Sequence, residues 1–284
     1  MIHKVKEARE EPVVSQSRNK DGNARRLGRG LAWLGAVAVK VVPILAVLLI
    51  WEMAPRLGLV DPFVLPSFSK VLQGLTGLSM KGEIPRHIAA SLERAGSGFV
   101  LAIGFSIPLG IFMGWFKRLE RIVNPLLEMG RNTSVLALYP VFILFFGVGE
   151  VSKVAIIFWG TIWPTLLNTI SGVKNVDPLL IKCARSMGVS TLTLFRKVIL
   201  PATIPSILTG LRLSAATAIL ILVAAEMLNA NAGLGFMIFY YESRYEIPEM
   251  YSGIILLSVL GVLVNYLLSA LEKYLTKWKE QINQ

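Results

Sequence analysis

Residues 175–205 of the chain are NVDPLLIKCARSMGVSTLTLFRKVILPATIP. They separate two apolar runs, residues 154–173 and residues 207–228, each close to the length of about twenty residues that a helix needs to cross a bilayer. A mixed polar and apolar segment between two such runs is typical of a connection on one side of a membrane. The segment therefore indicates a helical membrane protein, and its own pattern shows what kind of connection it is.

The first half of this segment carries the signals of a short helix. Asp177 followed by Pro178 predicts its start, because a carboxylate accepts hydrogen bonds from the free amides of a first turn and proline fits the first helical position. Gly188 fits the left-handed residue that closes a helix. The apolar residues between these signals are spaced to share one face of the helix: Leu179, Leu180, Cys183, Ala184 and Met187.

A second short helix is predicted over residues 191–199. Ser190 can cap its first turn, and Pro201 is expected to end it, because proline lacks an amide hydrogen and clashes with the preceding turn. Spacing alone leaves two interpretations of the whole segment open. It is either a docking element for a partner protein or an ordinary connection whose helices lie on the membrane surface.

Six apolar stretches predict an all-α membrane protein with about six transmembrane helices. They cover residues 31–54, 96–116, 134–148, 154–173, 207–228 and 251–271. Only 17% of the 284 residues are charged, against about 25% in an average soluble domain, which does not fit a water-facing surface. The net charge of +11 does not indicate nucleic-acid binding, because the basic residues lie in clusters between the apolar stretches.

The positions of Lys and Arg predict that both termini are cytoplasmic. Residues 1–30 hold eight of them, and further clusters lie in the expected loop of residues 116–122, between the fourth and fifth stretches, and after the sixth. The exception is the segment of residues 55–93 on the predicted outer side, with four basic residues: Arg56, Lys70, Lys81 and Arg86.

The same pattern divides the chain into four regions. We expect a disordered cytoplasmic tail over residues 1–30 and a first transmembrane helix with an external segment over residues 31–84. A membrane core over residues 85–273 and a cytoplasmic tail over residues 274–284 follow.

Few groups in the sequence suit metal binding or catalysis. Cys183 is the single cysteine, and His3 and His87 lie far apart with no second His or Cys near either of them. No G-x-x-x-x-G-K-[ST] phosphate loop occurs in the chain. We therefore expect no metal site here, and any ATP hydrolysis has to take place in another subunit.

The segment described first resembles the cytoplasmic signature of binding-protein-dependent permeases of the ATP-binding cassette (ABC) family, E-A-A-x3-G-x9-I-x-L-P. Four positions match it: Ala184, Gly188, Leu200 and Pro201. Three positions depart from it, since Lys182 replaces the glutamate, Cys183 the first alanine and Val198 the isoleucine. The reversed charge of Lys182 puts in doubt the pairing with a basic ATPase residue that the family glutamate implies.

Further motifs, in the expected order, resemble permeases for sulfonates, taurine and nitrate. They are FVLPS at 63–67, SLER at 91–94, IPLG at 107–110, NPLLE at 124–128, FGVGE at 146–150, AEML at 225–228 and GLG at 233–235. The chain thus resembles a type I ABC importer permease of the nitrate, sulfonate and taurine subfamily. The fold that this implies is six transmembrane helices with a cytoplasmic helix-turn-helix coupling loop.

The resemblance also implies a function and a set of partners. The chain would be a transporter subunit, not an enzyme, that imports an organic sulfonate, taurine or a nitrate-like anion across the bacterial cytoplasmic membrane. Its partners would be a second permease subunit in a homodimer, two ATP-binding subunits and an extracytoplasmic solute-binding protein. No cofactor is expected in the chain itself, since ATP and Mg²⁺ belong to the ATPase. The residues expected to couple it to the ATPase are Asp177, Pro178, Lys182, Cys183, Ala184, Gly188, Leu200 and Pro201.

Polar residues within or beside the apolar stretches are candidates for the solute path, because such groups are costly in lipid and usually face an interior. Glu226 has two open interpretations: a gate or polar partner that lines the passage, or a structural hydrogen bond to a neighbouring helix. Asn132 and Thr133, between Arg131 and Ser134, would offer hydrogen-bond donors to an anion if their stretch is embedded, and otherwise belong to a cytoplasmic loop.

Other residues of the apolar stretches are expected to hold helices together. Asn168 and Asn265 are expected to form hydrogen bonds between helices, and Gly110 and Gly114 to let two helices approach closely.

Two other classes of protein remain as alternatives. A secondary carrier would need no ATPase. A membrane-embedded enzyme would need paired carboxylates, a histidine cluster or a nucleophile at a membrane face, and the sequence shows none of these patterns.

Overall fold

The computed structural model describes residue 39 and residues 41–276 of the chain. The chain divides into two compact parts after Phe68, and each part is described by itself. The predicted tail of residues 1–30 lies outside the described residues, as do part of the first predicted span and the last eight residues of the predicted C-terminal tail.

The first part contains a helix over residues 41–56, which covers the second half of the first predicted span. Trp51, on this helix, donates a hydrogen bond from Nε1 to the carbonyl oxygen of Pro66 at 3.0 Å, so the turn-rich stretch that follows folds back against the helix. Many of the helix's apolar side chains are exposed, as expected for a helix that faces lipid: Val42, Ile44, Leu45, Val47, Leu49 and Ile50.

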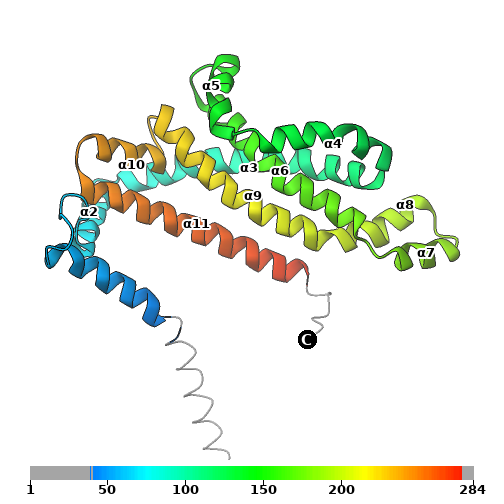
Figure 1. The fold of residues 1–284 in the computed structure, drawn as a ribbon, viewed down its shortest axis with the longest axis horizontal. Helices are drawn as coiled ribbons and strands as arrows, with labels where there is room; N and C mark the ends of the chain where they lie inside the picture. The colour runs from blue at the N-terminus through cyan, green and yellow to red at the C-terminus, as the bar shows by residue number, and fades with distance from the viewer. Residues whose placement is uncertain (1–38, 40, 277–284) are drawn as a thin grey trace, which may run out of the picture. The chain divides into compact units, whose positions relative to one another are not determined.

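The second part is all α-helical over the residues that the structure describes (Figure 1). Its elements in chain order are α2 (Phe68–Met80), α3 (Glu83–Trp115), α4 (Lys117–Asn132), α5 (Val135–Phe146), α6 (Glu150–Lys174), α7 (Pro178–Ser186), α8 (Thr191–Leu194), the π-helical η1 (Phe195–Ile199), α9 (Leu200–Asn229), α10 (Leu234–Ser243) and α11 (Ile247–Leu275). The predicted all-α fold is confirmed.

Four helices in the described residues are long and apolar enough to cross a membrane: α3, α6, the continuous helix Thr191–Asn229, and α11. A fifth span is possible if α4 and α5 act together, although they meet at a bend of 98°. The third predicted span, residues 134–148, therefore corresponds to α5, which is too short to count as a span without α4.

Residues 116–122 do not form the loop that was expected. Only Phe116 is extended, and α4 begins at Lys117. One face of α4 packs against side chains of α3 and α6, and its apolar residues recur at every fourth position: Leu119, Val123 and Leu127. The charged residues between them obscured this helical period in the sequence.

α6 lies between α3 and α9 and contacts both along much of its length (Figure 1). The approach of α3 to α6 depends on glycine. A Cβ atom at Gly110 would lie 2.7 Å from Cβ of Thr169, and one at Gly114 would lie 2.6 Å from Cβ of Val173. The predicted close packing at this glycine pair is confirmed.

α6 and α9 are joined by hydroxyl groups that the sequence analysis did not single out. Ser214 Oγ donates to the carbonyl oxygen of Thr161 at 2.6 Å and accepts a hydrogen bond from the Thr165 amide at 3.1 Å. The prediction for Asn168 is wrong, because its Nδ2 donates to the carbonyl oxygen of Pro164 in its own helix at 2.8 Å. Thr165 and Ser214 are fully buried, so this seam removes polar groups from lipid.

Candidate functional site

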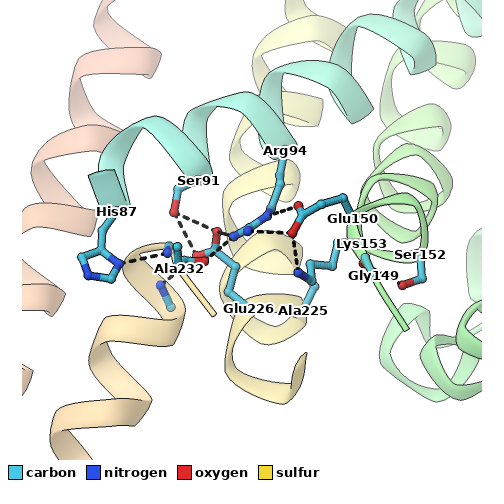
Figure 2. A network of polar contacts seen from close by, with 12 residues as sticks. His87, Ser91, Arg94, Gly149, Glu150, Ser152, Lys153, Ala225, Glu226 and Ala232 are labelled. Atoms are coloured by element: carbon cyan, nitrogen blue, oxygen red, sulfur yellow. Dashed lines mark hydrogen bonds and ion pairs between the residues drawn. The ribbon is translucent and has the colours of Figure 1, made fainter. Parts of the chain in front are cut away.

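Glu226 lies near the C-terminal end of α9 and is fully buried, with an exposed fraction of 0% (Figure 2). Its Oε1 accepts hydrogen bonds from Arg94 Nη1 at 2.7 Å and Ser91 Oγ at 2.9 Å, both on α3. Its Oε2 accepts one from the backbone amide of Gly235 at 2.8 Å. Both carboxylate oxygens are therefore satisfied, which a buried charge requires.

Arg94, which is 6% exposed, binds a second carboxylate. Its Nε and Nη2 donate to the two oxygens of Glu150, at the start of α6, at 2.5 and 2.9 Å. Lys153, only 3% exposed, donates from Nζ to Glu150 Oε1 at 2.8 Å. Two cations and two carboxylates thus balance in charge. We call the following five residues the Glu226 network: Ser91, Arg94, Glu150, Lys153 and Glu226.

The turn between α9 and α10 wraps around the Glu226 carboxylate. Gly233 has a φ of +127°, and a Cβ atom at this position would lie 2.2 Å from Glu226 Oε1. The Gly233 amide donates to His87 Nδ1 at 3.1 Å, and the Leu234 amide donates to Ser91 Oγ at 2.8 Å. The turn requires glycine here for both its backbone conformation and its space.

The Glu226 network joins α3, α6, α9 and the turn before α10, as Figure 2 shows. Four motifs that are far apart in the sequence contribute to it: SLER, FGVGE, AEML and GLG. Sequence reasoning singled out Glu226 but missed Arg94. The missed signal was a cation next to a long apolar run, because a buried cation needs a carboxylate partner.

The first two predicted helix caps of the 175–205 segment are present. Asp177 Oδ1 accepts a hydrogen bond from the Leu179 amide at 2.8 Å, with Pro178 at the first position of α7. Ser190 Oγ accepts one from the Thr193 amide at 3.3 Å and caps α8. Each side chain satisfies an amide of a first turn that has no partner within its helix.

The glycine turn after α7 is present as well. Gly188 has a φ of +71°, in the left-handed region. Its amide donates to the carbonyl oxygen of Arg185 at 3.0 Å, and the Val189 amide donates to that of Ala184 at 3.3 Å. These two bonds form a Schellman motif, in which the left-handed residue reverses the chain.

The predicted stop at Pro201 is wrong. α8 runs through η1 into α9 without a break, so Thr191–Asn229 is one helix of 39 residues. The Leu200 amide donates to the carbonyl oxygen of Phe195, five residues back, which is a π-helical turn. Pro201 has no amide hydrogen, so it cannot donate the usual hydrogen bond of an α-helix. The wider π turn just before it lets the helix continue past this position.

α7 has an inner and an outer face. Ile181 and Ala184 pack on the inner side, against a cluster of buried apolar residues: Val173, Val176, Leu194 and Ile199. Leu179, Leu180 and Met187 are 63%, 51% and 80% exposed. We call these three, with the exposed Lys182 and Cys183, the exposed face of α7. Of the five residues predicted to form one apolar face, only Ala184 therefore packs against the protein, and the other four are exposed.

Asn132 and Thr133 lie at the bend between α4 and α5, and both are exposed. Thr133 Oγ1 donates to the carbonyl oxygen of Met129 at 2.7 Å, and Arg131 forms an ion pair with Glu128 at 2.6 Å. The Asn132 side chain has no hydrogen-bond partner among the described residues.

Comparison with known proteins places this chain in a family. Residues 106–281 match the family described as binding-protein-dependent transport system inner membrane component. The chain is 37% identical over 233 residues, 82% of its length and 84% of the relative's, to a putative aliphatic sulfonates transport permease protein of Bacillus subtilis strain 168. It is 33% identical over 269 residues, 92% of its length and 98% of the relative's, to the taurine transport system permease protein of Escherichia coli K12.

A solved structure shares the fold. A chain of the MetNI methionine ABC transporter in inward-facing conformations superposes with a TM-score of 0.63 at 17% sequence identity, over 70% of this chain and 98% of that one. The sequence matches and the shared fold confirm the expectation of a permease subunit rather than an enzyme. The chain belongs to the family of inner membrane components of binding-protein-dependent transport systems.

Proposed function

We propose that the chain forms the translocation path for a small anion in an importer driven by a separate ATPase. The organic sulfonates and taurine named for the relatives are the first candidates, and a nitrate-like anion is the next. The observation that carries the proposal is the exposed face of α7, which presents three apolar side chains on a segment fixed at both ends.

Several features suit this segment to docking. Its ends are held by the Asp177 cap and the Gly188 turn, so little conformational entropy remains to be lost on binding. Its inner face is packed against the protein, so its position is tied to the helices around it. Apolar residues near the centre of a contact supply much of its affinity, which gives Leu180 and Met187 the role of anchors.

The charge of this segment suggests the character of the partner surface. Residues 177–201 contain one acidic residue, Asp177, whose carboxylate caps α7, and four basic residues: Lys182, Arg185, Arg196 and Lys197. We infer that the ATPase surface facing α7 is acidic, which would accommodate Lys182 in place of the family glutamate.

The remaining partners follow from the family. They are a second copy of the permease, two ATPase subunits that bind ATP and Mg²⁺, and an extracytoplasmic binding protein. With both termini on the cytoplasmic side of the membrane, the α7–α8 segment faces the ATPases and the Glu226 network faces the binding protein. Asn132 and Thr133 stay candidates for contact with the solute, and of the two the unpaired Asn132 amide is the better donor. Glu226, whose oxygens are already hydrogen-bonded, stays a candidate for a gate beside the path.

Reconstitution tests the proposal. The permease, its ATPase and its binding protein are placed in proteoliposomes, and uptake of radiolabelled taurine and ethanesulfonate is measured. We expect uptake that requires ATP and every component. Leu180→Asp is expected to abolish it and to reduce ATPase copurification, whereas Leu180→Met preserves both.

The alternatives give different results in the same assay. Uptake by the permease alone, without ATP, would identify a secondary carrier. Unchanged ATPase copurification with Leu180→Asp would remove α7 from the docking site.

A further inference from the structure

A recess of about 360 Å³ lies beside the Glu226 network, at the end of the helices where α3 and α10 begin. Its walls come from the turn between α2 and α3, the first turns of α3, and α10 with the turn before it. A volume of this size suits a small molecule. Six lining residues carry the argument: Lys81, Glu83, Arg86, His87, Asn231 and Glu246.

The acidic residues of the recess are already engaged. Tyr241 Oη donates to Glu83 Oε2 at 2.8 Å, and Arg244 Nε donates to Glu246 Oε1 at 2.9 Å. Burial and the adjacent Glu83 carboxylate raise the pKa of Tyr241, so its hydroxyl stays protonated and keeps this bond. Both carboxylates therefore have a fixed partner inside the protein.

The basic residues differ from the acidic ones. The side chains of Lys81 and Arg86 have no ion-pair or hydrogen-bond partner among the described residues, and neither does the Asn231 amide. Arg244 offsets Glu246, whereas Glu83 is bonded to a neutral hydroxyl and keeps its charge, so the charged residues that line the recess leave a net charge of +1. An anion would supply the missing partner.

His87 adds a directed donor. It is only 8% exposed, and its Nδ1 accepts the hydrogen bond from the Gly233 amide. The proton of the neutral ring must then be on Nε2, which makes that atom a donor. In Figure 2 this side of the ring points away from the Glu226 network, and among the described residues Nε2 has no hydrogen-bond partner.

The backbone contributes in the same direction. α3 begins at Glu83 without a side-chain cap, so the amides of Glu83 and Ile84 have no partner within the helix, while Pro85 has no amide to offer. The N-terminal end of a helix also carries partial positive charge, which favours an anion.

The sequence contains an independent sign of the same site. Lys81 and Arg86 belong to residues 55–93, the segment with basic residues on the predicted outer side, against the usual bias of Lys and Arg toward the cytoplasm. Membrane orientation does not explain the basic residues of this segment, and a ligand would account for the two that line the recess.

We propose that this recess is an anion-binding site that takes the sulfonate or carboxylate group of a small organic anion, with Arg86, Lys81 and His87 Nε2 as donors. The organic part of the ligand would lie against Phe236 and Tyr240, which line the same recess. The inference rests on the proposed function in one respect, the orientation of the chain in the membrane. In that orientation the recess faces the side where the binding protein delivers the solute.

A binding measurement tests the site without transport. The complete permease–ATPase complex, in nanodiscs of uncharged lipid and without binding protein or nucleotide, is titrated with ³⁵S-labelled ethanesulfonate. We expect saturable binding that acetate competes for and choline does not. Arg86→Gln should weaken it about tenfold or more, since hydrogen bonds to a charged group contribute about 1.5–3 kcal/mol. Lys81→Gln should weaken it less, and Arg86→Lys should restore part of it.

A control variant separates this site from general charge effects. Arg118→Gln removes an exposed cation from α4, at the other end of α3, and should leave binding unchanged. Absence of saturable binding, or equal binding by wild type and Arg86→Gln, would overturn the proposal. So would an effect of Arg86→Gln on association with the binding protein alone, which would mark the recess as a protein contact. Each of these results leaves ATP-driven uptake to be judged by the reconstitution assay.

Discussion

The Glu226 network lies near the C-terminal end of the helix Thr191–Asn229, and the exposed face of α7 comes just before the N-terminal end of that helix. The two regions are built in opposite ways. The network buries three charged residues, Arg94, Lys153 and Glu226, and satisfies them with one another, with the exposed Glu150 and with backbone groups. The exposed face of α7 leaves apolar groups at the surface of a segment that is otherwise well capped. The first region is complete without a partner, whereas the second has exposed apolar groups that the proposed ATPase contact would cover.

This difference predicts where substitutions change folding and where they change assembly. Variants of the network should unfold the protein, and variants of the exposed face of α7 should leave it folded but separate it from the ATPase.

Glu226→Leu should have the largest effect, about 3–5 kcal/mol of destabilisation, because it leaves the buried Arg94 with fewer partners and the Gly235 amide with none. The measurement is the thermal unfolding of the detergent-solubilised protein. The double variant Arg94→Met with Glu226→Leu should lose less than the sum of the two single changes. Strict additivity would show that the pair is not coupled.

Leu180→Asp should weaken ATPase binding by about 2 kcal/mol, close to the value of burying one leucine side chain, while the unfolding temperature stays the same. Binding is measured by titrating the purified ATPase against the permease. Leu180→Met, which keeps the apolar area, is the matched control. A loss of thermal stability with intact binding would reverse the roles given to the two regions.

Gly188→Ala should cost about 1–2 kcal/mol, because an L-residue is strained at a φ of +71° although the space around the position is open. The strain is confined to the turn between α7 and α8, so faster amide hydrogen exchange in residues 178–194 is the measurement. Gly77→Ala is the control, since Gly77 lies within α2 with open space and no positive φ. Equal exchange in both variants would show that the turn tolerates a side chain.

Lys182→Glu should have the smallest effect, under about 1 kcal/mol of ATPase affinity, as expected for an exposed charge. Against an acidic ATPase surface the change weakens binding, and Lys182→Gln should weaken it by about half as much. Tighter binding of Lys182→Glu would instead show a basic partner surface, as the family glutamate implies.

The local signals in the sequence predicted the local structure well. Asp177, Ser190 and Gly188 act over two to five residues, and each forms the cap or turn that its chemistry predicts. The sequence failed where distant residues decide the outcome. Arg94 and Glu226 are 132 residues apart, and only folding shows that they share an ion pair.

Two errors have specific physical causes. Pro201 was expected to end a helix, but the π turn of η1 lets the helix continue, and nothing in a single sequence marks such a turn. Asn168 was expected to bond to a second helix, but a carbonyl four residues back was closer. In each case a backbone carbonyl four or five residues earlier in the same helix accepted the hydrogen bond instead.

The absence of a break at Pro201 has a mechanical consequence. Thr191–Asn229 is one rod of 39 residues, about 58 Å long at 1.5 Å per residue. α8 forms one end of this rod and Glu226 lies near the other. A break at Pro201 would have let the α7–α8 segment move independently of α9, whereas a continuous helix links the two. If the ATPase docks on the α7–α8 segment as proposed, the same helix links that contact to the ion pairs that tie α3, α6 and α9 together.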